Sequence, residues 1–369
     1  MIDVIRVLAA WMVVAWHTGG AVNYRLPIFS SASIAVDVFM NVSGFLMLYL
    51  FWERRHKEPW ERPSTWFKFY VRRFFRIAPL YYVVLLGVIA LRLAPPPENG
   101  VSPSLWQWLL LRFSFLFGFI PHLSDHCLIP DWSLTLEMQF YCCFPFLALA
   151  LRRLGAGLFF FCCVVLSGLS GLAVGYYHDA ARNHLWYFPQ PTILPLKLHI
   201  FAVGMVIATA VIDGSTSMKS KWFLAALPVY LLTCKENFLW LMAAVYWSAY
   251  AIYGQSRVRS YLLRSVEMVN RALRGLPWRQ KLAECSYGTY LIHSVFIVLL
   301  LDRFRWRSGN RGNSLGQYLL ALVVVLGLTT LTSWILHEWI EKPGIDLGRR
   351  IAQRLRYPPQ ASDAPRAPQ

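Results

Sequence analysis

Long apolar runs recur along almost the whole chain and limit its possible folds more than any other feature. The 369 residues are 57% hydrophobic and 15% charged, whereas ordinary soluble domains are about half apolar and about a quarter charged. An α-helix needs about 20 mostly apolar residues to cross the hydrocarbon core, so this length supplies on the order of ten spans with short loops. The sequence therefore predicts an all-α polytopic integral membrane protein.

Window hydropathy predicts about ten transmembrane helices and one shorter apolar segment. The predicted helices cover the ranges 4–22, 34–51, 77–93, 132–151, 157–177, 196–212, 222–234, 238–253, 283–301 and 315–337. The shorter segment runs from Leu105 to Ile120 and is interrupted by Gln107 and Arg112. Because it is too short to span comfortably, we expect it to be interfacial or re-entrant.

The distribution of basic residues predicts the orientation of the chain. Its formal net charge of +17 would also suit a nucleic-acid binder, but Lys and Arg collect in the cytoplasmic loops of membrane proteins, which explains the charge without nucleic acid. The basic loop 53–76 then lies in the cytoplasm together with both termini, whereas the run from Arg303 to Arg311 departs from this bias. We expect one transmembrane domain over residues 1–345 and a cytoplasmic, disordered tail over residues 346–369, where proline is frequent.

The sequence matches no template for a metal site or for a covalent nucleophile. Its seven cysteines show no zinc-ligand spacing, and His122 and His126 are four apart but lack a third ligand. It contains no G-x-S-x-G elbow, no P-loop and no paired C-x-x-C. We therefore expect no metal and no bound cofactor.

Ionisable residues inside predicted helices are the main functional candidates, because charge is expensive in a bilayer. Arg6 and His17 share the first helix, within about 20° of one face and about 16 Å apart along the axis. Burial favours the neutral imidazole, which can accept a proton from an attacking hydroxyl. A histidine held only by packing and a hydrogen bond is the alternative for His17, and the spacing alone leaves it open.

Acidic and basic residues at the next two helices have two explanations each. Asp37 stands near the start of the second predicted helix, where the helix dipole favours an acidic residue as much as a site role does. Arg73 and Arg76 are three apart and share a face. Their forked guanidinium groups suit phosphates, although positive-inside anchoring also predicts arginines here.

Two polar stripes mark later helices. Ser133, Glu137 and Tyr141 recur every four residues and therefore lie on one face, where a buried carboxylate needs a partner. A second stripe comprises Ser286, Tyr290 and His293. For its histidine we expect a structural hydrogen bond.

Taken together, these segments resemble the bacterial membrane acyltransferase family 3, whose members modify lipopolysaccharide, exopolysaccharide and other surface glycans. The resemblance covers almost the whole chain, and several motifs occur in the right order. They are Arg6 with His17, the stretch from Asp37 to Gly44, Arg73-x-x-Arg76 with Pro79, Trp132-Ser133-Leu134 with Glu137, and Ser286-Tyr287 with Tyr290 and His293.

The resemblance implies an O-acyltransferase of the bacterial inner membrane that moves an acyl group, most often acetyl from acetyl-CoA, onto a sugar hydroxyl. It implies that His17 is the general base and that Glu137 and Asp37 belong to the catalytic site. Arg6, Arg73 and Arg76 would bind the acyl-CoA. The expected partners are acyl-CoA, a carbohydrate or lipid-linked glycan acceptor and the lipid bilayer, and no nucleic acid.

A transporter or flippase is the alternative from another functional class. In such a protein His17, Glu137 and the arginines would relay protons or anions. The chain shows no inverted repeat of the kind that many transporters contain. The acyl group itself also stays open, since succinyl or a longer chain would use the same residues.

Overall fold

The computed structural model describes residues 2–24, 26, 32–93, 104–120, 123, 130–181, 192–213, 221–233, 278–302 and 314–355. The regular secondary structure within these ranges is helical, and they contain no strand. Seven of the described helices are long and apolar enough to cross a membrane. The chain is therefore a helical integral membrane protein, but the predicted count of about ten spans is not confirmed.

The helices are α1 (Ile2–Ala21), α2 (Ala32–Glu53), α3 (Pro63–Ala90), α4 (Leu105–Phe113), α5 (Trp132–Ala181), α6 (Leu194–Asp213), α7 (Lys221–Thr233), α10 (Trp278–Ile297), α11 (Leu315–Leu336) and α12 (Lys342–Arg354). Three shorter turns accompany them: the 3-10 turn η1 (Leu116–Phe119) and the π-helical turns η5 (Val298–Asp302) and η6 (His337–Glu341).

Helix α3 begins earlier than hydropathy predicted. It starts at Pro63, which occupies the first turn where a missing N–H is tolerated, and not near residue 77. Lys68 and the arginines up to Arg76 lower the local hydropathy, although Lys68 is buried in the structure. The predicted basic loop 53–76 is therefore largely the first half of a helix.

Helices α5 and α7 differ from the predicted spans in other ways. The predicted spans 132–151 and 157–177 form the two parts of α5, which meet at Gly155 with a φ of 75°. Only glycine adopts this left-handed conformation without strain, so the chain kinks here. Helix α7 has 13 residues, too few to span the bilayer alone, and the predicted span 238–253 lies outside the described residues.

Two short helices, α4 and α12, lie where the sequence predicted an interfacial segment and a disordered tail. Helix α4 has nine residues, which is too short to cross the membrane, as predicted for residues 105–120. We expected a disordered tail from residue 346, but the chain stays helical to Arg354 because α12 packs along α3. Residues 356–369 and the loop around Arg303 to Arg311 lie outside the described residues.

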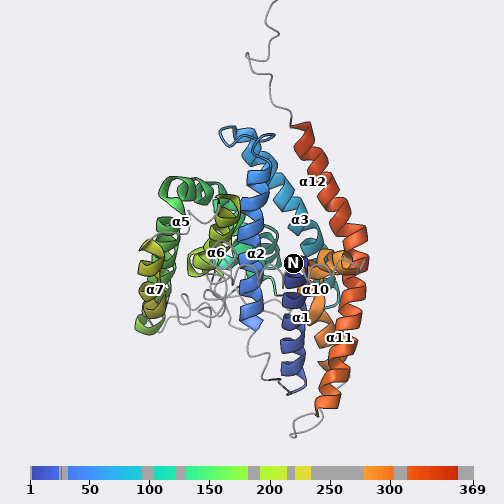
Figure 1. Ribbon diagram of the computed structural model, residues 1–369. Coiled ribbons are helices and arrows are strands. Elements are labelled where there is room, and N and C mark those ends of the chain that lie inside the picture. The colour runs from blue at the N-terminus through green and yellow to red at the C-terminus, as the bar shows by residue number, and fades with distance from the viewer. Residues whose placement is uncertain are drawn as a thin grey trace, which may run out of the picture.

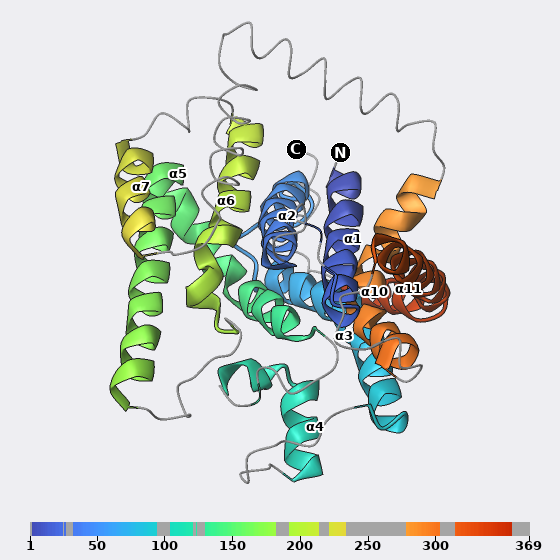
Figure 2. The same cartoon turned by 90° about the horizontal axis from the view of Figure 1, so that it is seen from below.

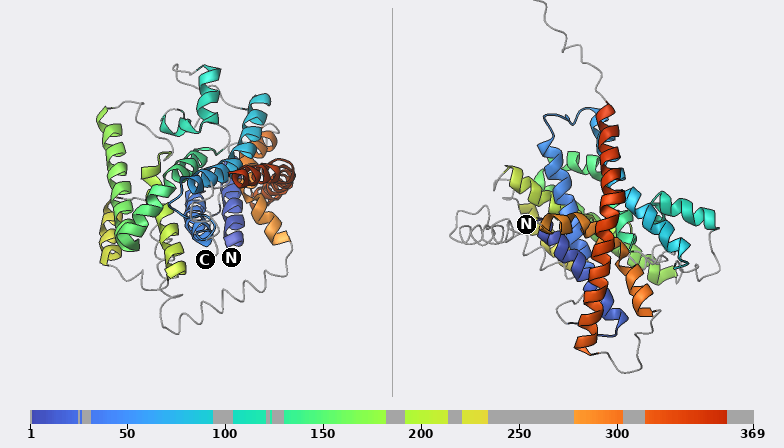
Figure 3. Two further views of the ribbon diagram at one scale, coloured as in Figure 1. Left: turned by 90° about the horizontal axis from the view of Figure 1, so that it is seen from above. Right: turned by 90° about the vertical axis from the view of Figure 1, so that its right-hand side faces the viewer.

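The helices pack around α1 and α2 at the centre of the molecule. Helix α1 contacts α2 on one side and α10 and α11 on the other (Figure 2). Helix α2 packs on α6, α6 packs on α5, and α7 covers the outer side of α5 (Figure 1). Helices α11 and α12 form one long rod along the edge of the bundle (Figure 3, right), so the centre is enclosed by α1, α2, α3, α5 and α10.

Close backbone contact holds α2 against α6. A Cβ atom on Gly44 would collide with the backbone of Phe201, and one on Gly204 would collide with the backbone of Asn41. Small residues at such a crossing let two membrane helices approach and gain van der Waals contact. Because α2 carries part of the central pocket, this contact also fixes the position of that wall.

We expect Gly204→Leu to lower the melting temperature of the detergent-solubilised protein by several degrees. Overpacking a tight interface costs about 1–3 kcal/mol, and the colliding atoms here belong to backbone that cannot move aside. The matched control is Gly171→Leu on α5, because a Cβ at Gly171 meets nothing within 4 Å. Equal melting temperatures for the two variants would contradict this account of the interface.

Candidate active site

A pocket with a cavity volume of about 120 Å³ lies between α1, α2, α3, α5 and α10. Helix α2 supplies most of its apolar wall. Its polar lining consists of Arg6, Ser43, Arg73, Arg76, Ser133, Glu137, Tyr141, Tyr287 and Tyr290. Residues from segments far apart in the sequence therefore meet in one place.

Two hydroxyl groups hold the carboxylate of Glu137 inside this pocket. Ser43 Oγ on α2 donates a hydrogen bond of 2.9 Å to Glu137 Oε1. The Tyr141 hydroxyl, one turn along α5, donates to the same oxygen. The polar stripe predicted from the spacing of four is thus present, and Ser43 is its partner from the neighbouring helix.

Three arginines give the pocket an excess of positive charge. The guanidinium of Arg73 lies 5.6 Å from the ring centre of Phe69 and 5.9 Å from that of Tyr141, and its buried Nε has no hydrogen-bond partner among the described residues. Arg6 and Arg76 are close enough to repel each other. Since Glu137 is the acidic residue in the lining, the pocket favours an anionic ligand.

His17 does not line the pocket but lies directly behind its wall. Its ring centre is 5.1 Å from that of His293 on α10, and the His293 ring is 6.1 Å from the ring of Tyr290. Tyr290 lines the pocket and forms a hydrogen bond of 2.7 Å with Ser133. His17, His293 and Tyr290 therefore form a continuous row from α1 to the pocket.

A backbone contact fixes the tautomer of His293. Its Nδ1 lies 2.6 Å from the carbonyl oxygen of Tyr290, one turn earlier in α10. A carbonyl only accepts, so Nδ1–H must donate, and in the neutral ring the proton is absent from Nε2. The structural hydrogen bond expected for His293 is confirmed, and its second nitrogen is left to accept.

Asp37 lies away from the pocket. Its Oδ1 is 3.2 Å from Nζ of Lys197, and both side chains are buried between α2 and α6. The structure thus brings Arg6, Arg73, Arg76 and Glu137 together, with His17 behind them, but leaves Asp37 in a neighbouring interface. Lys197 was missed, although a lysine within an otherwise apolar helix is itself a signal in the sequence.

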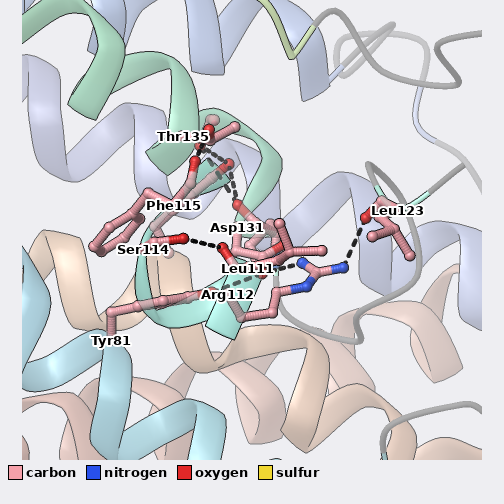
Figure 4. A network of polar contacts seen from close by, with 11 residues as sticks. Tyr81, Leu111, Arg112, Ser114, Phe115, Leu123, Asp131 and Thr135 are labelled. Carbon is pink, nitrogen blue, oxygen red and sulfur yellow. Dashed lines mark hydrogen bonds and ion pairs between the residues drawn. The ribbon is translucent and has the colours of Figure 1, made fainter. Parts of the chain in front are cut away.

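A buried ion pair between Arg112 and Asp131 fixes the start of α5 (Figure 4), the helix that carries Ser133 and Glu137. Arg112 is 0% exposed and forms an ion pair with Asp131, the residue before α5. Arg112 also donates to the carbonyl oxygen of Leu123 at 2.8 Å, and the Tyr81 hydroxyl donates to Asp131 at 3.1 Å. Helices α3, α4 and α5 are therefore tied together beside the pocket.

Spacing along the sequence predicted no role for two further pocket residues. They are Ser43, which binds Glu137, and Tyr287, whose hydroxyl donates to the carbonyl oxygen of Ile77 at 3.1 Å. Among the described residues no cluster of three or more His, Cys, Asp or Glu side chains has the geometry to hold a metal ion.

Comparison with known proteins gives one family. The family model for the acyltransferase domain of acyltransferase family 3 matches residues 1–338. Acyltransferase MdmB of Streptomyces mycarofaciens is 26% identical over 373 aligned residues, which cover 92% of this chain and 88% of that protein. Nose resistant to fluoxetine protein 6 of Caenorhabditis elegans is 25% identical over 195 residues, 48% of this chain and 23% of that protein. No solved structure matches the chain.

Proposed function

Since the chain belongs to acyltransferase family 3 and is an O-acyltransferase, we propose that it transfers an acetyl group from acetyl-CoA to a sugar hydroxyl of a surface or exported glycan. The observation that carries the proposal is the arginine-rich pocket with a pair of histidines directly behind its wall. Neither the family nor the relatives favour the transporter considered from the sequence.

The pocket is the donor side of this proposal. Acyl-CoA is strongly anionic, and the pocket supplies positive charge through Arg6, Arg73 and Arg76. Among the described residues, no carboxylate outside the pocket forms an ion pair with any of the three. Desolvated guanidinium groups bind phosphates and polarise carbonyl oxygens well. We propose that the thioester lies beside Arg73 and Arg76, which steady the negative charge on its oxygen during attack.

His17 is the general base of the proposed reaction. It accepts the proton of the acceptor hydroxyl while the hydroxyl oxygen attacks the thioester carbonyl. The carbon–sulfur bond then breaks, the ester forms, and the proton passes from His17 to the leaving thiolate. His293, held by the Tyr290 carbonyl, keeps the His17 ring in place, and no acyl-enzyme is needed.

Donor and acceptor approach from opposite sides of the row formed by Tyr290, His293 and His17. Transfer therefore requires the Tyr290 side chain to move aside, so that the hydroxyl on His17 reaches the thioester. The donor pocket lies on one side of Tyr290 and His293, and His17 lies on the other. We propose that the donor enters from the cytoplasm, at the end where α1 and α3 begin, and that the acceptor reaches His17 from the opposite side. Both termini then face the cytoplasm of a bacterial inner membrane.

The Glu137 carboxylate completes the proposed site. Held by Ser43 and Tyr141, it lies within electrostatic reach of Arg6 and orients that guanidinium toward the donor. Asp37 is also proposed to contribute, but only through its ion pair with Lys197, which fixes α2 and hence the pocket wall.

We expect the full-length protein in nanodiscs to move label from acetyl-labelled CoA onto a crude glycan-lipid extract. Arg73→Ala should raise the KM for acetyl-CoA about 10-fold, the usual cost of one charge-assisted hydrogen bond. Arg153→Ala is the control, because Arg153 is exposed on α5 and outside the pocket. Mass spectrometry of the labelled glycan would identify acyl group and acceptor.

Two results would contradict the proposal. The donor assignment fails if acetyl-CoA is not consumed in the presence of the glycan lipids. The second test places the same purified protein in vesicles. The assignment of the pocket to an enzyme fails if this protein moves unmodified glycan or protons across the membrane and Arg73→Ala abolishes that transport.

A further inference from the structure

At one end of the bundle α2 ends, α3 begins and α12 lies beside them (Figure 1). This end carries arginines beyond those of the pocket. Helix α12 approaches α3 closely. A Cβ on Gly348 would come within 2.6 Å of Phe75 Cβ, and one on Gly344 within 2.9 Å of Pro79. This packing places Arg349, which follows Gly348, beside the part of α3 around Phe75.

Arg54, Arg72 and Arg349 form a group at this end that we call the outer arginine cluster. Arg72 uses two nitrogens to bind both oxygens of Glu58, at 2.7 and 2.6 Å. Arg349 pairs with Asp346 at 3.0 Å in an exposed ion pair. Arg54 has no ion pair within the described ranges, and the cluster therefore carries a surplus of positive charge.

Arg54 lies within electrostatic reach of both other arginines. Partial burial lowers the pKa of Arg54, and the positive charge of Arg72 lowers it further; Glu58 opposes this effect, and Arg349 adds a smaller lowering. Like charges near one another raise the free energy of the empty site, and an anion placed between them lowers that cost. The surplus charge therefore points to a bound anion.

The cluster is continuous with the pocket through Arg73. Arg73 interacts electrostatically with Arg54 and Arg72 at the outer end and with Arg76 inside the pocket, and Arg76 in turn interacts with Arg6. A positive track thus leads from the end of the bundle to the site of acyl transfer. Such a track suits a ligand whose anionic groups lie at a distance from its reacting atom.

We propose that Arg54 and Arg349 form an outer subsite that binds the phosphate groups of the acyl donor's nucleotide. The inference rests on the proposed donor, acetyl-CoA, in which the pantetheine arm separates the thioester from a diphosphate and a phosphate monoester. The thioester lies among Arg73 and Arg76, and the arm runs outward along the track. Phosphate monoesters and diphosphates accept several charge-assisted hydrogen bonds, which paired guanidiniums supply.

The test compares acetyl-CoA with acetyl-pantetheine, which carries the same thioester without nucleotide or phosphates. The Arg54→Gln and Arg349→Gln double variant in nanodiscs should raise the KM for acetyl-CoA about 10-fold or more, while the KM for acetyl-pantetheine changes less than about 2-fold, because one ligand loses contacts that the other never makes. Arg350→Gln is the matched control, since Arg350 is the exposed neighbour of Arg349 and forms no part of the track.

Each outcome separates this inference from the proposed function. Equal KM changes for both donors, or no change for acetyl-CoA, would overturn the subsite. A change that appears only in nanodiscs with anionic lipid, and equally for both donors, would assign the cluster to lipid headgroups and also overturn it. Failure of the unmodified protein to use either thioester would instead refute the proposed function.

Discussion

Replacing His17 with alanine or glutamine is expected to reduce acyl transfer by about 1,000-fold while the protein still inserts and accumulates. General-base catalysis contributes about 100- to 10,000-fold to such reactions. Glutamine keeps much of the size and hydrogen bonding of histidine but cannot accept the proton, so both variants should lose the contribution of general-base catalysis to kcat. The measurement is kcat with acetyl-CoA and glycan acceptor, together with the melting temperature of each variant.

Two other histidines serve as comparisons for His17. His293→Gln should lower kcat less than His17→Gln does, because His293 orients the base through its contact with the His17 ring. His56→Ala should change nothing, since His56 is exposed in the loop after α2. Wild-type transfer by His17→Gln, or a larger loss in His293→Gln, would show that His17 is not the base.

Hydropathy predicted the helices whose residues are uniformly apolar and misjudged those that carry charge. Helices α1, α2, α6, α10 and α11 lie close to predicted spans. The start of α3 was missed because Lys68 and three arginines lower its hydropathy, while burial of Lys68 and the Arg72–Glu58 pair allow the helix to form. Polar groups that find partners in the fold are invisible to a window average.

The candidate site was predicted where spacing along one helix fixes neighbours. A spacing of four placed Ser133, Glu137 and Tyr141 on one face, and the structure puts them together in the pocket. The partner of Asp37 is Lys197, far away in the sequence, and no local pattern connects them. Contacts between helices depend on tertiary packing, which is also why the outer arginine cluster was not anticipated.

Breaking the buried ion pair between Arg112 on α4 and Asp131 is expected to destabilise the protein strongly. The carboxylate of Asp131 now has two side-chain partners, Arg112 and the Tyr81 hydroxyl. Arg112→Met leaves this carboxylate buried with the Tyr81 hydroxyl alone. Removing one member of a buried pair costs about 3–5 kcal/mol, because the remaining charge loses its compensation. The melting temperature of the solubilised protein should therefore fall sharply, and transfer should fall too, because the start of α5 carries Ser133.

The matched experiments separate the charge from the packing. Adding Asp131→Leu to Arg112→Met should recover much of the lost stability, since a pair replaced by apolar residues leaves no buried charge. Lys342→Met, which breaks the exposed pair with Glu338, should leave the melting temperature unchanged, because exposed ion pairs contribute little. If the double variant is as unstable as Arg112→Met, the loss comes from side-chain packing around Phe117, whose ring lies 4.1 Å from the guanidinium. In that case Arg112 holds α5 by its shape, and the Asp131 charge is not what fixes the start of the helix.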